Sequence, residues 1–444
     1  MKRVGGLFDQ IWTRDNLSKA VWNAARGKRH RREVIHFFKD LEANLAEMSH
    51  QIRRGTYPFQ SYKTFSIRDP KSREIHAPAF RDRVMHHALI AVTAPVFERG
   101  ALATSFACRK GKGQHEALKK ARDYTHRYAY YGKVDIKSYY DSIDHQRLEV
   151  RLRRRFREER LLDLWSQLLS SYEGKGAPRT GLPIGALTSQ YLGNFFLDEL
   201  DHFIASSGLI GGYVRYMDDV LMFGEREGLN QLREWIYAKL GAMGLQAKHG
   251  GEWNASKRGV PYLGFVLYPN RVRVNRMGRK RLRRKFRELE GEERAGRCAE
   301  REYQERATAL FAHPKWGDDL EWRRHLIEGI SSSFREVPER ASGFARRLVE
   351  PYGEELPFRV SEQESSFESQ QEQRLPRGAA PWHGDPWSPD VAPSGSPALF
   401  GGDESRQKSS LPGDIQKSEH APEDRRRIRA AKQPSGTDKK GDAT

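Results

Sequence analysis

Apolar side chains recur at helical spacing near the start of the chain and at strand spacing further along it. Residues 31–53 carry a clear helical pattern, with basic residues crowded around an apolar stripe. The stripe consists of Val34, Phe37, Phe38, Leu41, Leu45, Met48 and Ile52. We therefore predict an amphipathic core helix within a helical N-terminal extension, residues 1–54, that ends at Gly55-Thr56-Tyr57-Pro58. Its basic outer face is also compatible with contact to a nucleic-acid backbone.

Short strands are predicted after this break. Residues 62–67 and 73–76 form a strand pair joined by Asp69-Pro70-Lys71-Ser72, and a helix is expected over residues 80–97. Residues 128–136 have the composition of a buried strand that ends at Asp135. A carboxylate at the end of an apolar strand is costly unless it is exposed or coordinated, so Asp135 is a candidate ligand.

Two adjacent acids interrupt the apolar segment 211–224, whose sequence is GGYVRYMDDVLMFG. The alternation of Val214 with Tyr216, and of Val220 with Met222, predicts two short strands that meet at a tight turn. Asp218 and Asp219 fall at this turn. Carboxylate oxygens are the ligands that Mg²⁺ prefers, so the pair predicts a metal anchor. The alternative is a solvated turn, and a third acid that folding brings close, such as Asp135, favours the metal site.

The rest of the chain is predicted to be largely helical. A Gly/Pro turn at residues 180–190 leads into a helix that ends near residue 205, and a second amphipathic helix covers 229–243. A strand edge is expected at 245–249 and a strand pair with a central glycine at 260–267. Residues 271–350 are expected to be mostly helical.

Charge divides the chain into a basic part and a neutral tail. The net charge is +19 over 444 residues, and residues 359–444, with 13 basic and 14 acidic side chains, contribute −1, which leaves +20 for residues 1–358. Such a charge indicates a polyanionic partner, either nucleic acid or an anionic membrane. Nucleic acid is favoured, because the sequence contains neither a membrane-spanning apolar run nor a signal peptide. The two cysteines, Cys108 and Cys298, predict neither a disulfide framework nor a zinc site, and a cytoplasmic location is expected.

Cationic loops supply candidate phosphate contacts. Lys71 and Arg73 lie near the tip of the first hairpin and could close over a triphosphate, although charged tips are commonly only solvated. Residues 105–113, SFACRKGKG, form a glycine-punctuated basic loop before a helix that starts near Gln114. Loop amides, a helix N-terminus and cations suit a phosphate, although the glycine spacing is not that of a Walker loop.

These motifs together resemble a prokaryotic reverse transcriptase of the group II intron-like lineage over residues 55–268. Seven blocks occur in the order of that family: the hairpin with Lys71 and Arg73, SFACRKGKG (105–113), DIKSYYDSIDH (135–145), LPIGALTSQ (182–190), YMDD (216–219), LQAKH (245–249) and YLGF (262–265). Most relatives begin the fourth block with Gln-Gly and end it with Ser-Pro. The Ile184-Gly185 and Ser189-Gln190 of this chain are similar to the enzymes of diversity-generating retroelements.

The resemblance implies an α+β right-hand polymerase fold. Fingers and a palm with an antiparallel sheet would occupy residues 55–268, a basic helical thumb 269–356, and a disordered tail 357–444. Asp135, Asp218 and Asp219 would hold two Mg²⁺ ions, with Mn²⁺ as a substitute, and Lys248 would act as the acid for pyrophosphate. Predicted nucleotide-binding residues are Lys71, Arg73, Arg109, Ile136, Tyr140, Ile184, Gly185 and Gln190. The primer end would lie against Tyr262, Leu263, Gly264 and Phe265.

The function implied is RNA-directed DNA polymerisation, with template RNA, primer or cDNA, and dNTPs as partners and no membrane contact. In the diversity-generating family the enzyme makes errors at template adenines, and a small accessory protein usually assists it. Ile184 would remove a hydrogen-bonding check on base-pair geometry. Tyr140 would lie under the sugar and exclude a 2′-hydroxyl, or would be a core aromatic. Retron, anti-phage and intron-derived reverse transcriptases are alternatives, as is a catalytically silent RNA-binding protein with this fold.

Overall fold

The computed structural model describes residues 2–68, 72–248 and 250–330, together with residues 344, 347 and 348. These residues belong to one compact unit, Met1–Val391. A second unit, Ala392–Thr444, falls outside the described residues, as do Lys71 and the predicted tail 357–444. No described helix is both long enough and apolar enough to cross a lipid bilayer.

Four helices form the N-terminal segment: α1 (Phe8–Ile11), α2 (Arg14–Ala25), α3 (Arg32–Lys39) and α4 (Leu41–Arg54). The helix predicted over residues 31–53 is divided in two, because Asp40 has the non-helical angles φ −117° and ψ 42°. Its apolar stripe is buried as predicted, with Val34, Leu45, Met48 and Ile52 each at most 1% exposed. These helices share one hydrophobic core with α5 (Phe80–Gly100).

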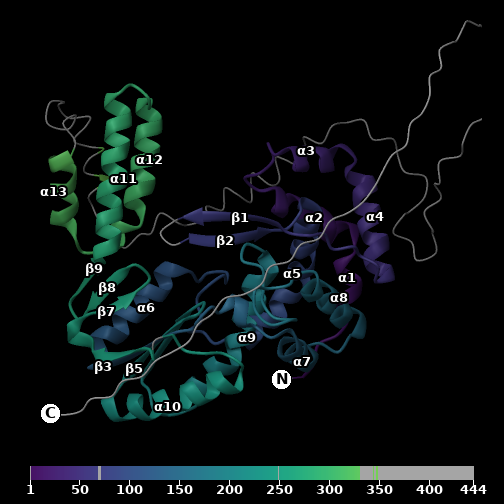
Figure 1. Ribbon diagram of the computed structural model, residues 1–444, viewed down its shortest axis with the longest axis horizontal. Helices are drawn as coiled ribbons and strands as arrows, with labels where there is room; N and C mark the ends of the chain where they lie inside the picture. Colours follow the sequence, from purple (N-terminus) through teal and green to yellow (C-terminus); the bar gives the residue numbers. More distant parts are fainter. Residues whose placement is uncertain (1, 69–71, 249, 331–343, 345–346, 349–444) are drawn as a thin grey trace, which may run out of the picture. The chain divides into compact units, whose positions relative to one another are not determined.

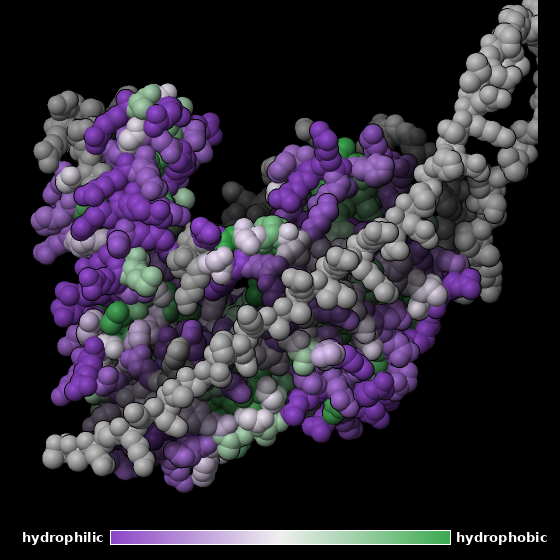
Figure 2. Space-filling view, in the orientation of Figure 1, coloured by the Kyte–Doolittle hydropathy of each residue, from purple (hydrophilic) through white to green (hydrophobic). Residues whose placement is uncertain are grey.

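The predicted first hairpin is present as β1 (Lys63–Arg68) and β2 (Ser72–Ala77), which pair antiparallel. A patch of hydrophobic colour lies over this hairpin in the space-filling view (Figure 2), and Phe65 and Ile67 of β1 are 50% and 40% exposed. The hairpin therefore presents apolar as well as charged side chains to solvent.

The predicted antiparallel sheet is present and has four strands, two of which, β3 and β5, are labelled in Figure 1. Its order is β4 (Gly212–Tyr216), β5 (Asp219–Gly224), β3 (Tyr130–Asp135) and β6 (Glu252–Ala255). Strand β6 was not predicted, because four residues after Gly250-Gly251 are too few to show a period. Within the predicted strand edge 245–249, of which residues 245–248 are described, Ala247 forms an isolated antiparallel bridge with Ile136.

Both faces of this sheet are covered. One face, with Val134, Val220 and Met222, packs in one hydrophobic core with α9 (Leu187–Ala205) and α10 (Arg226–Ala242). The opposite face, with Val214, Leu221 and Phe223, packs with α6 (Gln114–Arg127) and a second sheet. The remaining helices of this part are α7 (His145–Arg155) and α8 (Glu159–Ser170), with short 3₁₀ turns at Tyr140–Ser142 and Ser256–Arg258. Burial on both faces explains why β4 and β5 are apolar throughout.

The second sheet has the order β7 (Val260–Tyr262), β8 (Phe265–Tyr268) and β9 (Arg271–Val274). It is followed by α11 (Arg276–Arg294), α12 (Glu300–Ala312), the 3₁₀ turn Pro314–Trp316 and α13 (Leu320–Ile330). Residues 271–350, predicted to be mostly helical, begin with β9, which pairs with β8, and the described residues from 276 to 330 are then mainly helical. The visible face of α11, α12 and α13 is mostly hydrophilic (Figure 2), in keeping with its many basic residues.

Candidate active site

Strand register brings two of the three predicted acids face to face. Asp135, the last residue of β3, is the partner of Asp219, the first residue of β5. Residues paired directly across an antiparallel ladder point to the same face of the sheet. Asp218 precedes Asp219 in the turn after β4, and Met217 enters this turn with φ 57°. Asp135 and the adjacent pair Asp218 and Asp219, more than 80 positions later, therefore meet at the ends of the two inner strands of the sheet.

Burial has the largest effect on the pKa values of Asp218 and Asp219 at these strand ends. It raises the pKa of Asp219 to about 6 against the opposing effect of Lys133, whose Nζ lies 3.3 Å from Asp219 Oδ2. Burial also raises the pKa of Asp218, and the negative charge of Asp135 adds to the effect, while Arg73 and Lys248 act in the opposite direction. Asp135 is more exposed and pairs with Lys248, its Oδ2 lying 3.4 Å from Nζ. The negative charges of the three acids repel one another, and the nearby lysine and arginine side chains offset only a part of this repulsion.

The oxygen donors of the three acids suit a divalent cation. Carboxylate oxygens suit Mg²⁺, and the buried Oδ1 of Asp219 has no hydrogen-bond partner among the described residues. Among the residues that the structure describes, no three His, Cys, Asp or Glu side chains are arranged to hold a metal ion. Lys133 and Lys248 instead each approach one oxygen of an acid.

Of the predicted nucleotide-binding residues, Tyr140 contacts the turn that carries Asp218, and Ile184 and Gly185 contact β2. The Tyr140 hydroxyl donates to Met217 Sδ at 3.6 Å and the ring is half-buried, whereas the neighbouring Tyr139 is 3% exposed and belongs to the core. The carbonyl of Ile184 accepts from the main-chain N–H of His76 at 2.8 Å. Gly185 has φ 115°, and a Cβ there would lie 2.9 Å from Ile75 Cγ2. The turn that begins the fourth motif is therefore docked on β2, with Gln190 half-buried in the first turn of α9.

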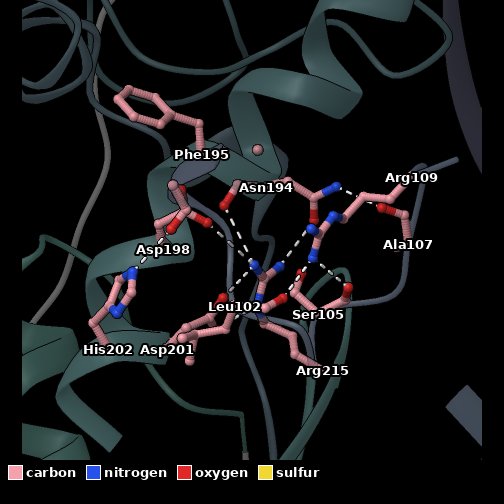
Figure 3. Close-up of polar contacts among 12 residues, drawn as sticks. Leu102, Ser105, Ala107, Arg109, Asn194, Phe195, Asp198, Asp201, His202 and Arg215 are labelled. Atoms are coloured by element: carbon pink, nitrogen blue, oxygen red, sulfur yellow. Dashed lines mark hydrogen bonds and ion pairs between the residues drawn. The ribbon is translucent and has the colours of Figure 1, made fainter. Parts of the chain in front are cut away.

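Arg109 is not available for the role predicted from the sequence. Its Nε donates to Glu98 Oε2 at 2.8 Å, and Nη1 donates to the carbonyls of Leu102 and Ser105 (Figure 3). The side chain is 10% exposed. The prediction that Arg109 clamps a triphosphate is therefore corrected: its guanidinium holds residues 102–109 in shape. Arg73, in contrast, is exposed, and its positive charge acts on Asp218.

The predicted primer-holding motif is divided between core and surface. Tyr262 and Phe265 are 1% and 0% exposed, so their side chains face the hydrophobic core and not a primer. Leu263 and Gly264 form the turn between β7 and β8, and Gln114 Nε2 donates to the Leu263 carbonyl at 3.0 Å. Contact with a primer end stays a prediction for this turn. Ile136 is likewise 2% exposed, so only its main chain could serve the site.

Two basic residues near the acids were missed. Lys133 lies two positions before Asp135 and therefore on the same face of β3. Arg215 is fully buried in β4 and bonds to Asp201 and Asn194 of α9 (Figure 3). A signal existed for the second, because an arginine inside an apolar strand needs a buried acid, and Asp198 and Asp201 stand three residues apart in an apolar helix.

Comparison with known proteins agrees with this geometry. Residues 67–267 match the family described as reverse transcriptase (RNA-dependent DNA polymerase). Protein YkfC of Escherichia coli (strain K12) is 27% identical over 152 residues, covering 32% of this chain and 39% of YkfC. The group II intron-encoded protein LtrA of Lactococcus lactis subsp. cremoris is 25% identical over 170 residues, covering 37% of this chain and 28% of LtrA. The chain thus spans less than half the length of these relatives.

Solved structures give a weaker likeness. Telomerase from Candida albicans, in complex with a TWJ fragment of telomeric RNA, aligns with a TM-score of 0.38 and 12% identity, covering 66% of this chain and 59% of that chain. The fold assignment therefore depends on strand order and register and not on this alignment. From the family match and the paired acids we conclude that residues 67–267 form a reverse transcriptase domain of the group II intron-like kind.

Proposed function

We propose that this chain is an RNA-directed DNA polymerase that adds deoxynucleoside triphosphates to a primer 3′-hydroxyl along an RNA template. One observation carries the proposal: the register that sets Asp135 opposite Asp219, with Asp218 in the adjoining turn. Acids held this close in a partly buried site need a cationic partner. The basic charge of residues 1–358 suits a nucleic-acid substrate.

Asp135 and Asp218 are the principal metal ligands in this proposal, and Asp219 contributes less because Lys133 already pairs with one of its oxygens. The Ile136 carbonyl is a further acceptor. Two Mg²⁺ ions, or Mn²⁺ in their place, would acidify the primer hydroxyl and neutralise the leaving pyrophosphate when bound. Loss of one of the two principal carboxylates costs about 10³-fold or more in rate, as expected for removal of transition-state charge stabilisation.

The remaining residues handle the nucleotide. Lys248 Nζ, beside Asp135, gives a proton to the leaving pyrophosphate. Arg73 on β2 neutralises the triphosphate, with Lys71 outside the described residues as its neighbour in sequence. Tyr140, fixed over Met217, supports the sugar and excludes a 2′-hydroxyl with its ring. The Leu263–Gly264 turn meets the primer end.

Within this activity, the chain is the error-prone enzyme of a diversity-generating retroelement, assisted by a small accessory protein. Ile184 supports this assignment, because its apolar side chain cannot hydrogen-bond a nucleotide and its main chain is tied to His76. A base pair of wrong geometry then loses no hydrogen bond at this position. Errors should be most frequent opposite template adenine.

Primer extension tests the activity. The purified chain, an RNA template, a DNA primer, dNTPs and Mg²⁺ should yield cDNA, and Asp218→Ala should yield none while keeping its affinity for the primed template. A chain that binds the primed template but never extends it would overturn the proposal in favour of a silent RNA-binding protein. Accurate copying of adenines would favour a retron, anti-phage or intron-derived enzyme.

A further inference from the structure

A buried arginine lies beside the turn that carries Asp218 and Asp219. Arg215 is 0% exposed and, being one residue before Tyr216 in β4, points to the face covered by α9. Its Nε and Nη2 donate to the two oxygens of Asp201, each at 2.6 Å, and Tyr213 donates to the same carboxylate at 2.5 Å. This bidentate pair fixes the plane of the guanidinium (Figure 3).

The remaining edge of the guanidinium faces the acidic turn. Arg215 Nη1 donates to the Met217 carbonyl at 3.1 Å and to Asn194 Oδ1 at 2.9 Å. Met217 has φ 57°, a left-handed conformation that is strained for a non-glycine residue. The bond to its carbonyl holds the peptide plane that immediately precedes Asp218.

Asn194 extends the same contact to the basic loop. Its Nδ2 donates to the Ala107 carbonyl at 2.7 Å (Figure 3). The main chain of Arg215 is also paired with this loop, because its N–H donates to the Thr104 carbonyl and its carbonyl accepts from the Phe106 N–H. The loop 105–113 and the acidic turn are therefore supported by one guanidinium and one amide.

Stability alone does not explain a charge at this place. A buried ion pair contributes little net stability, and apolar side chains of similar volume often do as well or better. The site is costlier still because Asp198, 3.9 Å from Arg215 Nη2, has two buried oxygens that accept no hydrogen bond from the described residues. What apolar side chains could not supply is the donor to the Met217 carbonyl.

We propose that Arg215 is a positioning residue of the polymerase site, which with Asn194 and Asp201 sets the conformation of the turn bearing Asp218 and Asp219. The proposal rests on the proposed function. It extends that function to residues that touch neither nucleotide nor primer. Its distinguishing consequence is that activity depends on the donor to Met217, and stability does not.

The test removes the buried pair as a unit. In the variant Tyr213→Phe with Asp201→Leu and Arg215→Met, both charges of the pair are removed together. Burial already raises the pKa of the neighbouring Asp198 to about 7, so this acid can stay protonated without Arg215, and the melting temperature should stay within a few degrees of the wild type. Without the donor to Met217, kcat should fall by about 10²-fold, the size expected when preorganised charged groups are displaced. Affinity for the primed template should not change, and Mn²⁺ affinity, followed by electron paramagnetic resonance, should fall several-fold.

A matched arginine on α7, which bonds to the same helix α9, is the control. Arg151 donates to Glu199 at 2.8 Å and to the Phe195 carbonyl at 3.0 Å, and its side chain is 13% exposed, but it does not contact the turn. Arg151→Met should lower the melting temperature and leave both kcat and Mn²⁺ affinity near those of the wild type. Such a result would separate positioning from general destabilisation.

A second variant decides the matter if the triple variant does not fold. Asn194→Ala keeps the Arg215–Asp201 pair and removes the acceptor beside Met217 and the link to Ala107, so kcat should fall about tenfold at an unchanged template affinity, consistent with loss of one buried hydrogen bond. A folded triple variant, or Asn194→Ala, with wild-type kcat and Mn²⁺ affinity would overturn the positioning role. A wild-type chain that extends no primer would instead overturn the proposed function, while the Mn²⁺ measurement would still test Arg215.

Discussion

Lys133 Nζ lies 3.3 Å from Asp219 Oδ2 and 3.0 Å from the carbonyl oxygen of Pro261. One ammonium group thus joins the most buried of the three acids to β7, the strand that leads into the Leu263–Gly264 turn. The same ammonium pairs with the Asp219 carboxylate and donates to the Pro261 carbonyl. The contact is a part of the site that the family motifs do not contain.

Replacing Lys133 by Met should move the pH dependence of divalent-ion binding to higher pH. Burial raises the pKa of Asp219 to about 6, and the ammonium of Lys133 acts in the opposite direction. Removing the ammonium should therefore raise the pKa of Asp219 further. Metal ligands must be deprotonated, and the acid limb of Mn²⁺ binding should therefore move to higher pH. Titration of Mn²⁺ between about pH 5 and pH 8.5 measures the shift, in the range where a carboxylate of this pKa ionises.

Lys133→Arg is the control for this prediction, because it keeps the charge while changing the shape of the donor. Its acid limb should stay close to that of the wild type. An unchanged limb in Lys133→Met would show that the ammonium has no electrostatic effect on the acid.

Asp219→Asn should stabilise the metal-free protein above about pH 6. The pKa of Asp219 rises from 3.8 to about 6 on folding, so the folded chain disfavours the carboxylate; below the unfolded pKa both states are protonated and nothing is lost. The penalty develops as pH rises through this window and reaches about 2–3 kcal/mol at neutral pH. Melting temperatures with a chelator at pH 4 and pH 7.5 should therefore separate wild type from variant only at the higher pH.

Added Mg²⁺ should reverse this order, because the wild type binds the ion in its folded state and the variant has lost a carboxylate. Equal melting temperatures at both pH values would contradict the assigned pKa.

The acids could be found from the sequence, because Asp135 and Asp219 lie at the ends of apolar strands and Asp218 lies in the turn between two such strands. Their meeting depended on register, and Asp135 and Asp219 share a face only because β3 and β5 are antiparallel partners. The apolar stripe of the N-terminal helices could also be predicted from the sequence. The break at Asp40 could not, since the apolar spacing continues across it.

The errors share one cause, which is that partners distant in sequence decide the outcome. Arg109 stands in a basic loop and looks free, but Glu98 and two carbonyls take its donors. Tyr262 and Phe265 stand in a family motif, but the core between α6 and the second sheet buries them. Strand β6 exists because β3 offers it an edge.

Arg73 and Arg109 should therefore respond differently to substitution. Arg73→Ala removes an exposed cation whose charge reaches Asp218, so KM for dNTP should rise about tenfold with little effect on melting temperature, as for loss of one charge-assisted contact. Arg109→Met leaves Glu98 and two carbonyls without their donor, so the melting temperature should fall while KM for dNTP stays near that of the wild type.

Steady-state kinetics on an RNA template and thermal unfolding of the two variants distinguish a nucleotide-binding role from a structural one. The assignment of Arg109 to the framework fails if its variant raises KM for dNTP as strongly as Arg73→Ala does.

Ile184→Gln should make the enzyme more accurate. Ile184 is half-buried beside β2, and its main chain is fixed by the bond to His76, so a longer polar side chain can be accommodated without moving the turn. A glutamine amide would regain a hydrogen bond that only a correctly paired nucleotide satisfies, and one such bond discriminates by about 1 kcal/mol, or about fivefold. Sequencing of cDNA should show fewer substitutions, with the largest reduction opposite template adenine. Ile184→Leu, which keeps the apolar character, should leave the error spectrum unchanged, and equal accuracy of wild type and Ile184→Gln would contradict the role of this residue in fidelity.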